Sequence, residues 1–183
     1  MAVRLTSLPL ALLCAVLAAP DAQAENCRLS VSQPRIDYGA IRKEGLVERA
    51  SIALGTRSLQ VNVFCTEPAT IGLRFIGVAA DGQGFQFGRQ GRFRLSLKHA
   101  QVDGRAVAWE AQHLPGEPVG GQLLPGQTLV VRAAGMPVTG RQLTAQVDID
   151  TDLPADALEV RSETRLEGLG SFELVSSAVP PSQ

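Results

Sequence analysis

Two cysteines, Cys27 and Cys65, are the residues of this chain whose type and position most clearly suggest chemistry. Each lies on the apolar face of a segment in which apolar and polar residues alternate, so both thiols should face a protein core. Such a pair forms a disulfide or serves as part of a metal site. A metal site needs further ligands, and the two histidines, His99 and His113, lie far away in the sequence. We therefore expect a Cys27–Cys65 disulfide.

An acidic run has the spacing of a calcium-binding loop: Asp148, Asp150, Asp152, Asp156 and Glu159. Oxygen ligands at such positions suit Ca²⁺, but the sharp turn of that loop requires a glycine where this chain has Leu153. The run also follows a strand-like segment, whereas a calcium loop of this kind follows a helix. We favour the alternative, in which the carboxylates are solvent-facing residues of a strand and a turn, and we expect no metal.

Motifs for catalysis are absent from the sequence. It has no Gly-x-Ser-x-Gly elbow, no HExxH helix and no phosphate-binding loop. His99 and His113 are expected at the surface. Trp109 could stack on a sugar, but a single tryptophan next to a predicted strand more often packs in the core or at its rim. We therefore expect neither an enzyme nor a cofactor.

The first 24 residues have the pattern of a secretory signal peptide. Arg4 provides a short basic start, residues 8–19 are apolar, and Ala22-Gln23-Ala24 is a small-x-small cleavage site. The apolar stretch is short for a transmembrane helix, although an uncleaved anchor is the alternative. Cleavage would remove Cys14 and leave Cys27 and Cys65 in an oxidising compartment, where disulfides persist.

Removal of residues 1–24 from the 183-residue chain leaves 159 residues, enough for one domain with a substantial core. We assign that domain to residues 25–175. The net charge of −1 argues against a nucleic-acid partner, which would favour a basic surface. No later stretch of about 18 apolar residues follows, so no membrane span is expected after signal removal.

Period-two alternation of apolar and polar residues predicts short β-strands through most of the mature chain. The clearest segments are 27–32, 58–65, 70–77, 93–97, 129–131, 142–150 and 172–174. Ile36, Tyr38 and Ile41 predict a short edge piece, and Asp103-Gly104 a turn. Residues 111–126 are expected to form a long loop, and residues 155–165 at most one helical turn. Residues 176–183 are expected to be a flexible tail. Seven to nine strands with turns between them predict an all-β sandwich.

The ordered set of these motifs resembles a known family. Cys27 begins the first strand; the motifs that follow are Ile36-Asp37-Tyr38-Gly39, Leu59 to Cys65, Phe87-Gly88, Val102-Asp103-Gly104, Leu143 to Ile149, Leu166-Glu167-Gly168 and Phe172 to Val175. The mature chain resembles the fimbrial (pilin-like) subunits of the bacterial chaperone–usher class. The likeness covers most of residues 27–175.

This resemblance implies an immunoglobulin-like sandwich that lacks its last strand and exposes an apolar groove. A periplasmic chaperone would fill the groove first, and a donor strand from another fimbrial subunit would replace it during assembly at an outer-membrane usher. The core-facing residues of the terminal strands are the candidates for the groove wall: Leu29, Val31, Phe172 and Leu174. The protein would pass through the periplasm and function at the cell surface as a structural or adhesive subunit of a fimbria.

Two features depart from the family pattern. Only Glu25 and Asn26 precede Cys27 in the expected mature chain, whereas shaft subunits carry a longer N-terminal arm that they donate. We therefore expect a tip or minor subunit. The chain also continues past Val175 without the usual aromatic residue near the terminus. The alternative is a free-standing periplasmic or secreted binding module with a complete sandwich, which would be a stable monomer when expressed alone.

Overall fold

The computed structural model describes residues 26–41, 51–112, 120–159 and 163–178. The predicted signal peptide and His113 lie outside these ranges. The strands are β1 (Cys27–Val31), β2 (Ser51–Gly77), β3 (Ala79–Asp81), β4 (Gly84–Phe87), β5 (Gly91–Val102), β6 (Arg105–Ala106), β7 (Ala108–Ala111), β8 (Gln122–Leu123), β9 (Thr128–Ala133), β10 (Met136–Pro137), β11 (Thr139–Pro154) and β12 (Gly170–Ala178). One short 3-10 helix covers Ala155–Leu158. No helix in these ranges is long and apolar enough to cross a bilayer.

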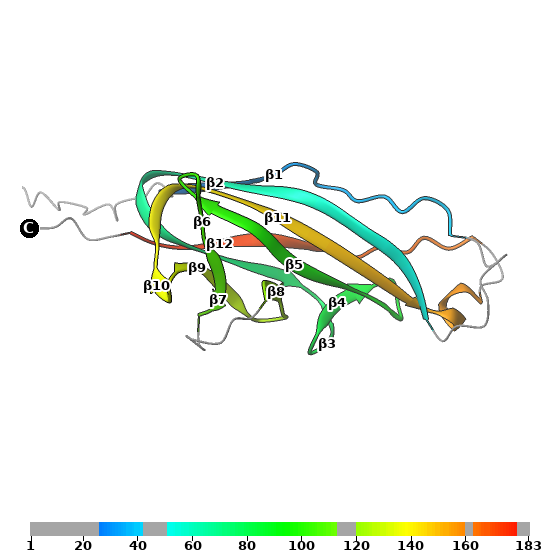
Figure 1. Ribbon diagram of the computed structural model, residues 1–183. Coiled ribbons are helices and arrows are strands. Elements are labelled where there is room, and N and C mark those ends of the chain that lie inside the picture. Colours follow the sequence, from blue (N-terminus) through cyan, green and yellow to red (C-terminus); the bar gives the residue numbers. More distant parts are fainter. Residues whose placement is uncertain (1–25, 42–50, 113–119, 160–162, 179–183) are drawn as a thin grey trace, which may run out of the picture.

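The strands form one curled antiparallel sheet that folds over into two layers (Figure 1). β2 runs through both layers and turns back on itself at one end of the molecule. Its first part lies between β1 and β11, and β11 pairs in turn with β5. Its second part lies between β12 and β9, and β9 pairs with β7. The all-β sandwich expected from the sequence is confirmed.

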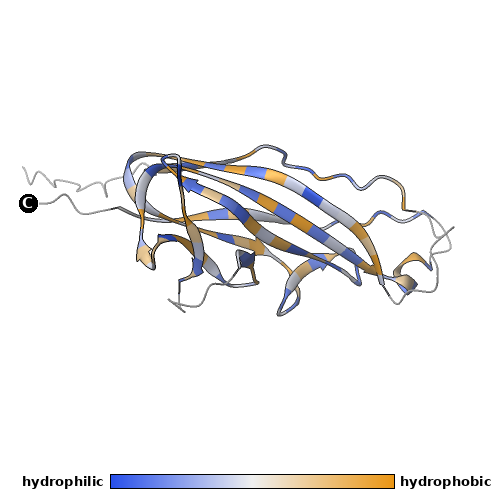
Figure 2. Ribbon diagram, viewed as in Figure 1, coloured by the Kyte–Doolittle hydropathy of each residue, from blue (hydrophilic) through white to orange (hydrophobic). Residues whose placement is uncertain are grey.

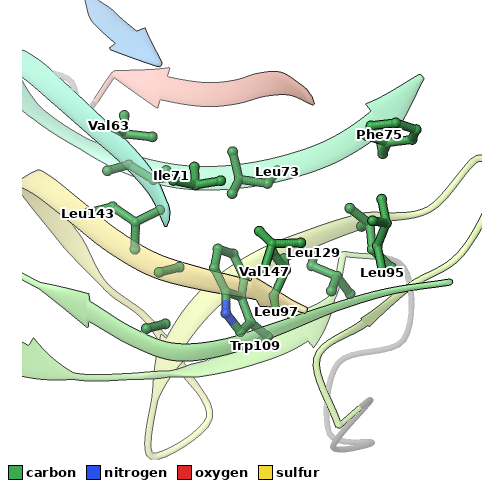
Figure 3. Packing of buried hydrophobic residues seen from close by; sticks show 14 of the residues in the cluster. Val63, Ile71, Leu73, Phe75, Leu95, Leu97, Trp109, Leu129, Leu143 and Val147 are labelled. Carbon is green, nitrogen blue, oxygen red and sulfur yellow. The ribbon is translucent and has the colours of Figure 1, made fainter. Parts of the chain in front are cut away.

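Alternating side chains build the core between the layers. Apolar and polar residues alternate along the long strands (Figure 2), which places every second side chain inside. Figure 3 shows these inward side chains meeting from both layers, with Val63, Leu73, Leu129, Leu143 and Val147 among them. All five are fully buried. Each such side chain contributes roughly 1.5–3 kcal/mol of transfer free energy.

Several strand boundaries differ from the sequence-based expectation. The segments predicted at 58–65 and 70–77 are two parts of the single strand β2, and β11 is longer than predicted. The two-residue strand β8 lies inside the predicted loop 111–126. The single turn expected after residue 155 and the Asp103-Gly104 turn are both present, the latter with positive φ angles of 48° and 77°.

The predicted edge piece around Gly39 is wrong as a strand, because residues 33–41 have no ladder partner among the described residues. Pro34 has no N–H to donate. The Asp37 carboxylate accepts a hydrogen bond from the Gly39 N–H at 2.7 Å, and Gly39 has a φ of +69°. This local Asx-type turn interrupts the extended backbone that a ladder would require.

Candidate strand-accepting edge

The disulfide joins the first strand to the core. Cys27 and Cys65 lie directly opposite each other in the register of β1 and β2, both buried, and their sulfur atoms are bonded. The predicted pairing is therefore confirmed. It anchors one end of β1, which among the described strands pairs only with β2.

β1 and β12 are the outermost strands of the two layers on the same side of the molecule. Both pair with β2, and some of their Cα atoms lie within 8 Å of each other. This distance is shorter than the roughly 10 Å between packed sheets, so the two strands lean together. We call this region the β1–β12 seam, formed by Leu29 and Val31 of β1 and by Phe172 and Leu174 of β12.

The four predicted groove residues face the core across this seam, but none is fully buried. Leu29 and Val31 pair with Val63 and Val61, which have no exposed surface, while Leu29 and Val31 themselves are only half-buried. Phe172 and Leu174 are also half-buried, whereas their partners Phe75 and Leu73 are buried. The seam thus has core-facing apolar side chains without the cover that a further strand would provide.

The backbone of β12 presents a free edge. All nine residues of β12 pair with residues 69–77 of β2, and no described strand pairs with the other edge. Unpaired N–H and C=O groups in a row form a template for another strand. On the outward face, Arg74 donates two hydrogen bonds to Glu173, at 2.9 and 2.6 Å, which tie β12 to β2 but leave the free edge open.

Aromatic rings occupy the end of the molecule far from the disulfide. The Phe75 ring makes edge-to-face contacts with three other rings, at centroid distances of 4.8 Å to Phe85, 5.8 Å to Phe93 and 5.1 Å to Phe172. These rings close the core where β12 begins.

The segment before β2 joins this aromatic end through Tyr38. Its ring lies 6.1 Å from that of Phe87 in edge-to-face geometry. The Tyr38 hydroxyl is hydrogen-bonded to the Thr151 hydroxyl at 2.8 Å. Thr151 is buried on the inner face of β11, so this bond gives its hydroxyl a partner in the core. The sequence placed Tyr38 in an edge piece and did not predict this contact. An inward threonine in an apolar alternation is the sequence signal that a polar partner is required.

The acidic run adopts the strand arrangement favoured over a calcium loop, but the expectation that its carboxylates face solvent is wrong for Asp148, which is buried. Asp148, Asp150 and Asp152 alternate along the outer face of β11. Asp148 forms an ion pair with Lys98 at 2.7 Å, and Asp152 forms one with Arg94 at 2.7 Å. Within the ranges that the structure describes, no three His, Cys, Asp or Glu side chains are grouped to hold a metal ion.

The Asp148 carboxylate has a lowered pKa. The Lys98 ammonium group, the Gln146 amide and the Ser58 hydroxyl all donate to it and lower its pKa from 3.8 to about 2, although burial opposes the shift. A carboxylate with a lowered folded-state pKa stabilises the protein above its unfolded-state pKa. That stabilisation is lost as the pH falls from about 4 toward 2.

We therefore expect Asp148→Asn to lower the free energy of unfolding at pH 7 by about 2 kcal/mol. The variant should also lose part of the decline in stability between pH 4 and pH 2. Urea unfolding at a series of pH values measures both effects. Glu163→Gln, which removes an exposed carboxylate, is the control; an equal loss in both variants would contradict the role assigned to Asp148.

Two further candidate residues, Trp109 and His99, lie on β7 and β5. Trp109 is 6% exposed on the inner face of β7, opposite Val131, so its ring cannot stack on a ligand at the surface. His99 is exposed on β5. Two hollows on the outer face of β5 share Arg92 and Arg94, whose guanidinium groups are already paired with aspartates.

Comparison with known proteins gives a similarity of fold alone. No protein-family model matches the chain, and no curated protein matches it. Among solved structures, the P pilus rod subunit PapA is similar over 83% of this chain and 99% of that chain, with 13% sequence identity and a TM-score of 0.46. The similarity is one of overall fold.

Proposed function

We propose that this protein is an exported structural subunit of a fimbria or fimbria-like assembly, and that it binds an extended strand of another polypeptide at the β1–β12 seam. The observation that carries the proposal is the free edge of β12 next to core-facing side chains that are only half-buried. The function is structural and involves no catalysis.

The seam offers both components of strand addition. Backbone N–H and C=O groups along β12 supply hydrogen bonds, which give affinity for any extended segment. Leu29, Val31, Phe172 and Leu174 would contact alternate side chains of the incoming strand, which gives specificity. An unoccupied edge of this kind favours aggregation, so a protein that keeps it open needs a partner during export.

The proposed partners are a periplasmic chaperone, an outer-membrane usher and neighbouring fimbrial subunits. They are supported by the resemblance of the sequence to chaperone–usher fimbrial subunits. The protein would pass through the periplasm to the cell surface. The proposal includes a tip or minor position, because cleavage after Ala24 would leave only Glu25 and Asn26 before Cys27. N-terminal sequencing of the exported protein tests this part, and a mature start well before Asn26 would contradict it.

The alternative is a free-standing binding module, and solution behaviour distinguishes the two. We expect the chain, expressed in a periplasm without partners, to self-associate. A nine-residue peptide with alternating apolar and polar residues should convert it to a monomer. The peptide should also slow hydrogen exchange at alternate amides of β12, because those amides point to the free edge. Light scattering and exchange mass spectrometry measure these effects.

Variants on the two faces of β12 provide the matched control. Leu174 faces the core opposite Leu73, whereas Val175 faces outward opposite Gly72. Leu174→Ser should weaken peptide binding by about tenfold or more, and Val175→Ser should change it little. A stable monomer whose β12 amides are all protected without peptide would favour the free-standing module and contradict the proposed function.

A further inference from the structure

A patch of exposed apolar side chains lies on the outer face of the layer that contains β12. It consists of Ile76 on β2, Val78 just after β2 and Leu169 just before β12, and we call it the outer patch. These side chains are 51%, 64% and 74% exposed. Phe64 and Met136 are the other exposed large apolar residues of the described chain, so three of the five gather at this one place.

Glycines around the outer patch show that its side chains point away from the core. An added Cβ at Gly168 or at Gly170 would overlap phenylalanine rings of the core, so both positions face inward. Leu169 lies between them in extended chain and therefore faces outward. Gly77 also faces inward, because a Cβ there would lie 2.8 Å from a core ring, so the patch residues on either side of it face outward.

An ion pair borders the outer patch on the same face. The side chains of Arg74 and Glu173 are joined by two hydrogen bonds, at 2.9 and 2.6 Å, and remain 42% and 45% exposed. Successive outward positions on β2 and β12 therefore form three rows: Arg74 with Glu173, Ile76 with Ser171, and Val78 beside Leu169.

The three rows are self-complementary. Two copies can meet face to face about a two-fold axis that runs parallel to the strands, between β2 and β12. This operation places β2 of one copy over β12 of the other, at the same level along the strands. Val78 then contacts Leu169 of the second copy, and Arg74 contacts Glu173 of the second copy. Both contacts are favourable, and each occurs twice.

We propose that the outer patch binds a second copy of this chain in a weak face-to-face dimer. The patch is small beside the buried area of about 800 Å² per partner in a stable interface, so we expect a dissociation constant of roughly 0.1–1 mM. The chain is then monomeric through this face at micromolar concentration. The contact forms where copies are held close together, because effective concentrations there reach the millimolar range.

Charge reversal separates this contact from effects within one chain. Arg74→Glu and Glu173→Arg each place like charges across the interface, so each variant alone should dimerise at least about tenfold more weakly than the original protein. An equal mixture of the two variants should dimerise as tightly as the original, because opposite charges meet again between the copies. Neither chain regains its internal ion pair in the mixture, so the recovery reports the intermolecular contact.

Sedimentation equilibrium of the full chain between about 10 µM and 1 mM measures these constants. A nine-residue peptide with alternating apolar and polar residues is added to occupy the seam. Leu169→Ser should weaken the dimer by about tenfold, whereas Met136→Ser, at an exposed apolar residue outside the patch, is the control and should not. A mixture of the charge variants that associates no more tightly than either alone would overturn the proposal.

Cross-linking tests the register of the dimer whether or not the seam is occupied. Val78→Cys and Leu169→Cys are prepared as separate variants, one of them with a size tag, and are treated with a short bismaleimide at about 0.5 mM protein. The mixed pair should cross-link several-fold more than either variant alone, because these two positions face each other only between copies. Met136→Cys gives the background of an exposed thiol. Equal cross-linking of all variants would overturn the dimer and leave strand binding at the seam untouched.

Discussion

Replacing Cys27 and Cys65 together by alanine is expected to lower the free energy of unfolding by about 4 kcal/mol. The disulfide connects residues separated by 38 positions, and in the chain-entropy model a closed loop of this size destabilises the unfolded chain by that amount. In the folded protein the same bond holds β1, a five-residue strand that borders the seam. Urea unfolding of the oxidised protein and of the double variant measures the loss.

The location of β1 suggests a second consequence of this change. Without the disulfide, β1 is held to β2 by its ladder and by the side chains of Leu29 and Val31, so its amides should exchange faster than those of β5 or β11. Ser30→Ala, on the outward face of the same strand, is the control and should have little effect. A loss below about 1 kcal/mol in the double variant would contradict a structural role for the bond.

Gly121→Ala is expected to destabilise the protein by about 3 kcal/mol or more. Gly121 has a φ of +75°, which side chains rarely adopt, and its carbonyl accepts a hydrogen bond from the Leu97 N–H at 2.7 Å. A Cβ at this position would overlap the carbonyl oxygen of Leu97. The variant must therefore break the contact between β8 and β5 or distort β5 itself.

Gly126→Ala separates the two causes of this effect. Gly126 has the same φ of +75°, but a Cβ there would have nothing within 4 Å. We expect a loss of about 1 kcal/mol for this control, from the backbone conformation alone. Thermal unfolding of both variants measures the difference. Similar losses in the two variants would show that the close approach of Gly121 to Leu97 does not contribute.

The strands themselves could be predicted because their signal is local. In 93–97 and 142–150 the side chains alternate with period two, and one buried face is enough to produce that pattern. The disulfide was predictable for a related reason, because both cysteines lie on the apolar face of such a segment. The Asp103-Gly104 turn was also predictable, since two residues with positive φ favour this pair.

Other features could not be predicted because they depend on partners that are distant in the sequence. Tyr38 meets Thr151 across 113 positions. Asp103 forms a turn with Gly104 and has a second role. Its carboxylate accepts hydrogen bonds from the N–H groups of Arg141 and Gln142 at 3.1 and 2.9 Å. Neither contact has a local pattern, so sequence reasoning identified the residues as an edge piece and a turn and missed their second role.

The amino-acid sequence alone determined the all-β class, the inward and outward faces of most strands and the disulfide, because alternation and cysteine placement are properties of neighbouring residues. The tertiary structure decided which edge stays free among the described strands and which residues meet at the aromatic end of the core. Both depend on the pairing of β1 and β12 with the two parts of β2 and on the meeting of Tyr38, Phe87 and Gly168. Such long-range pairing is set by the packing of the whole core and has no counterpart in any single segment of the chain.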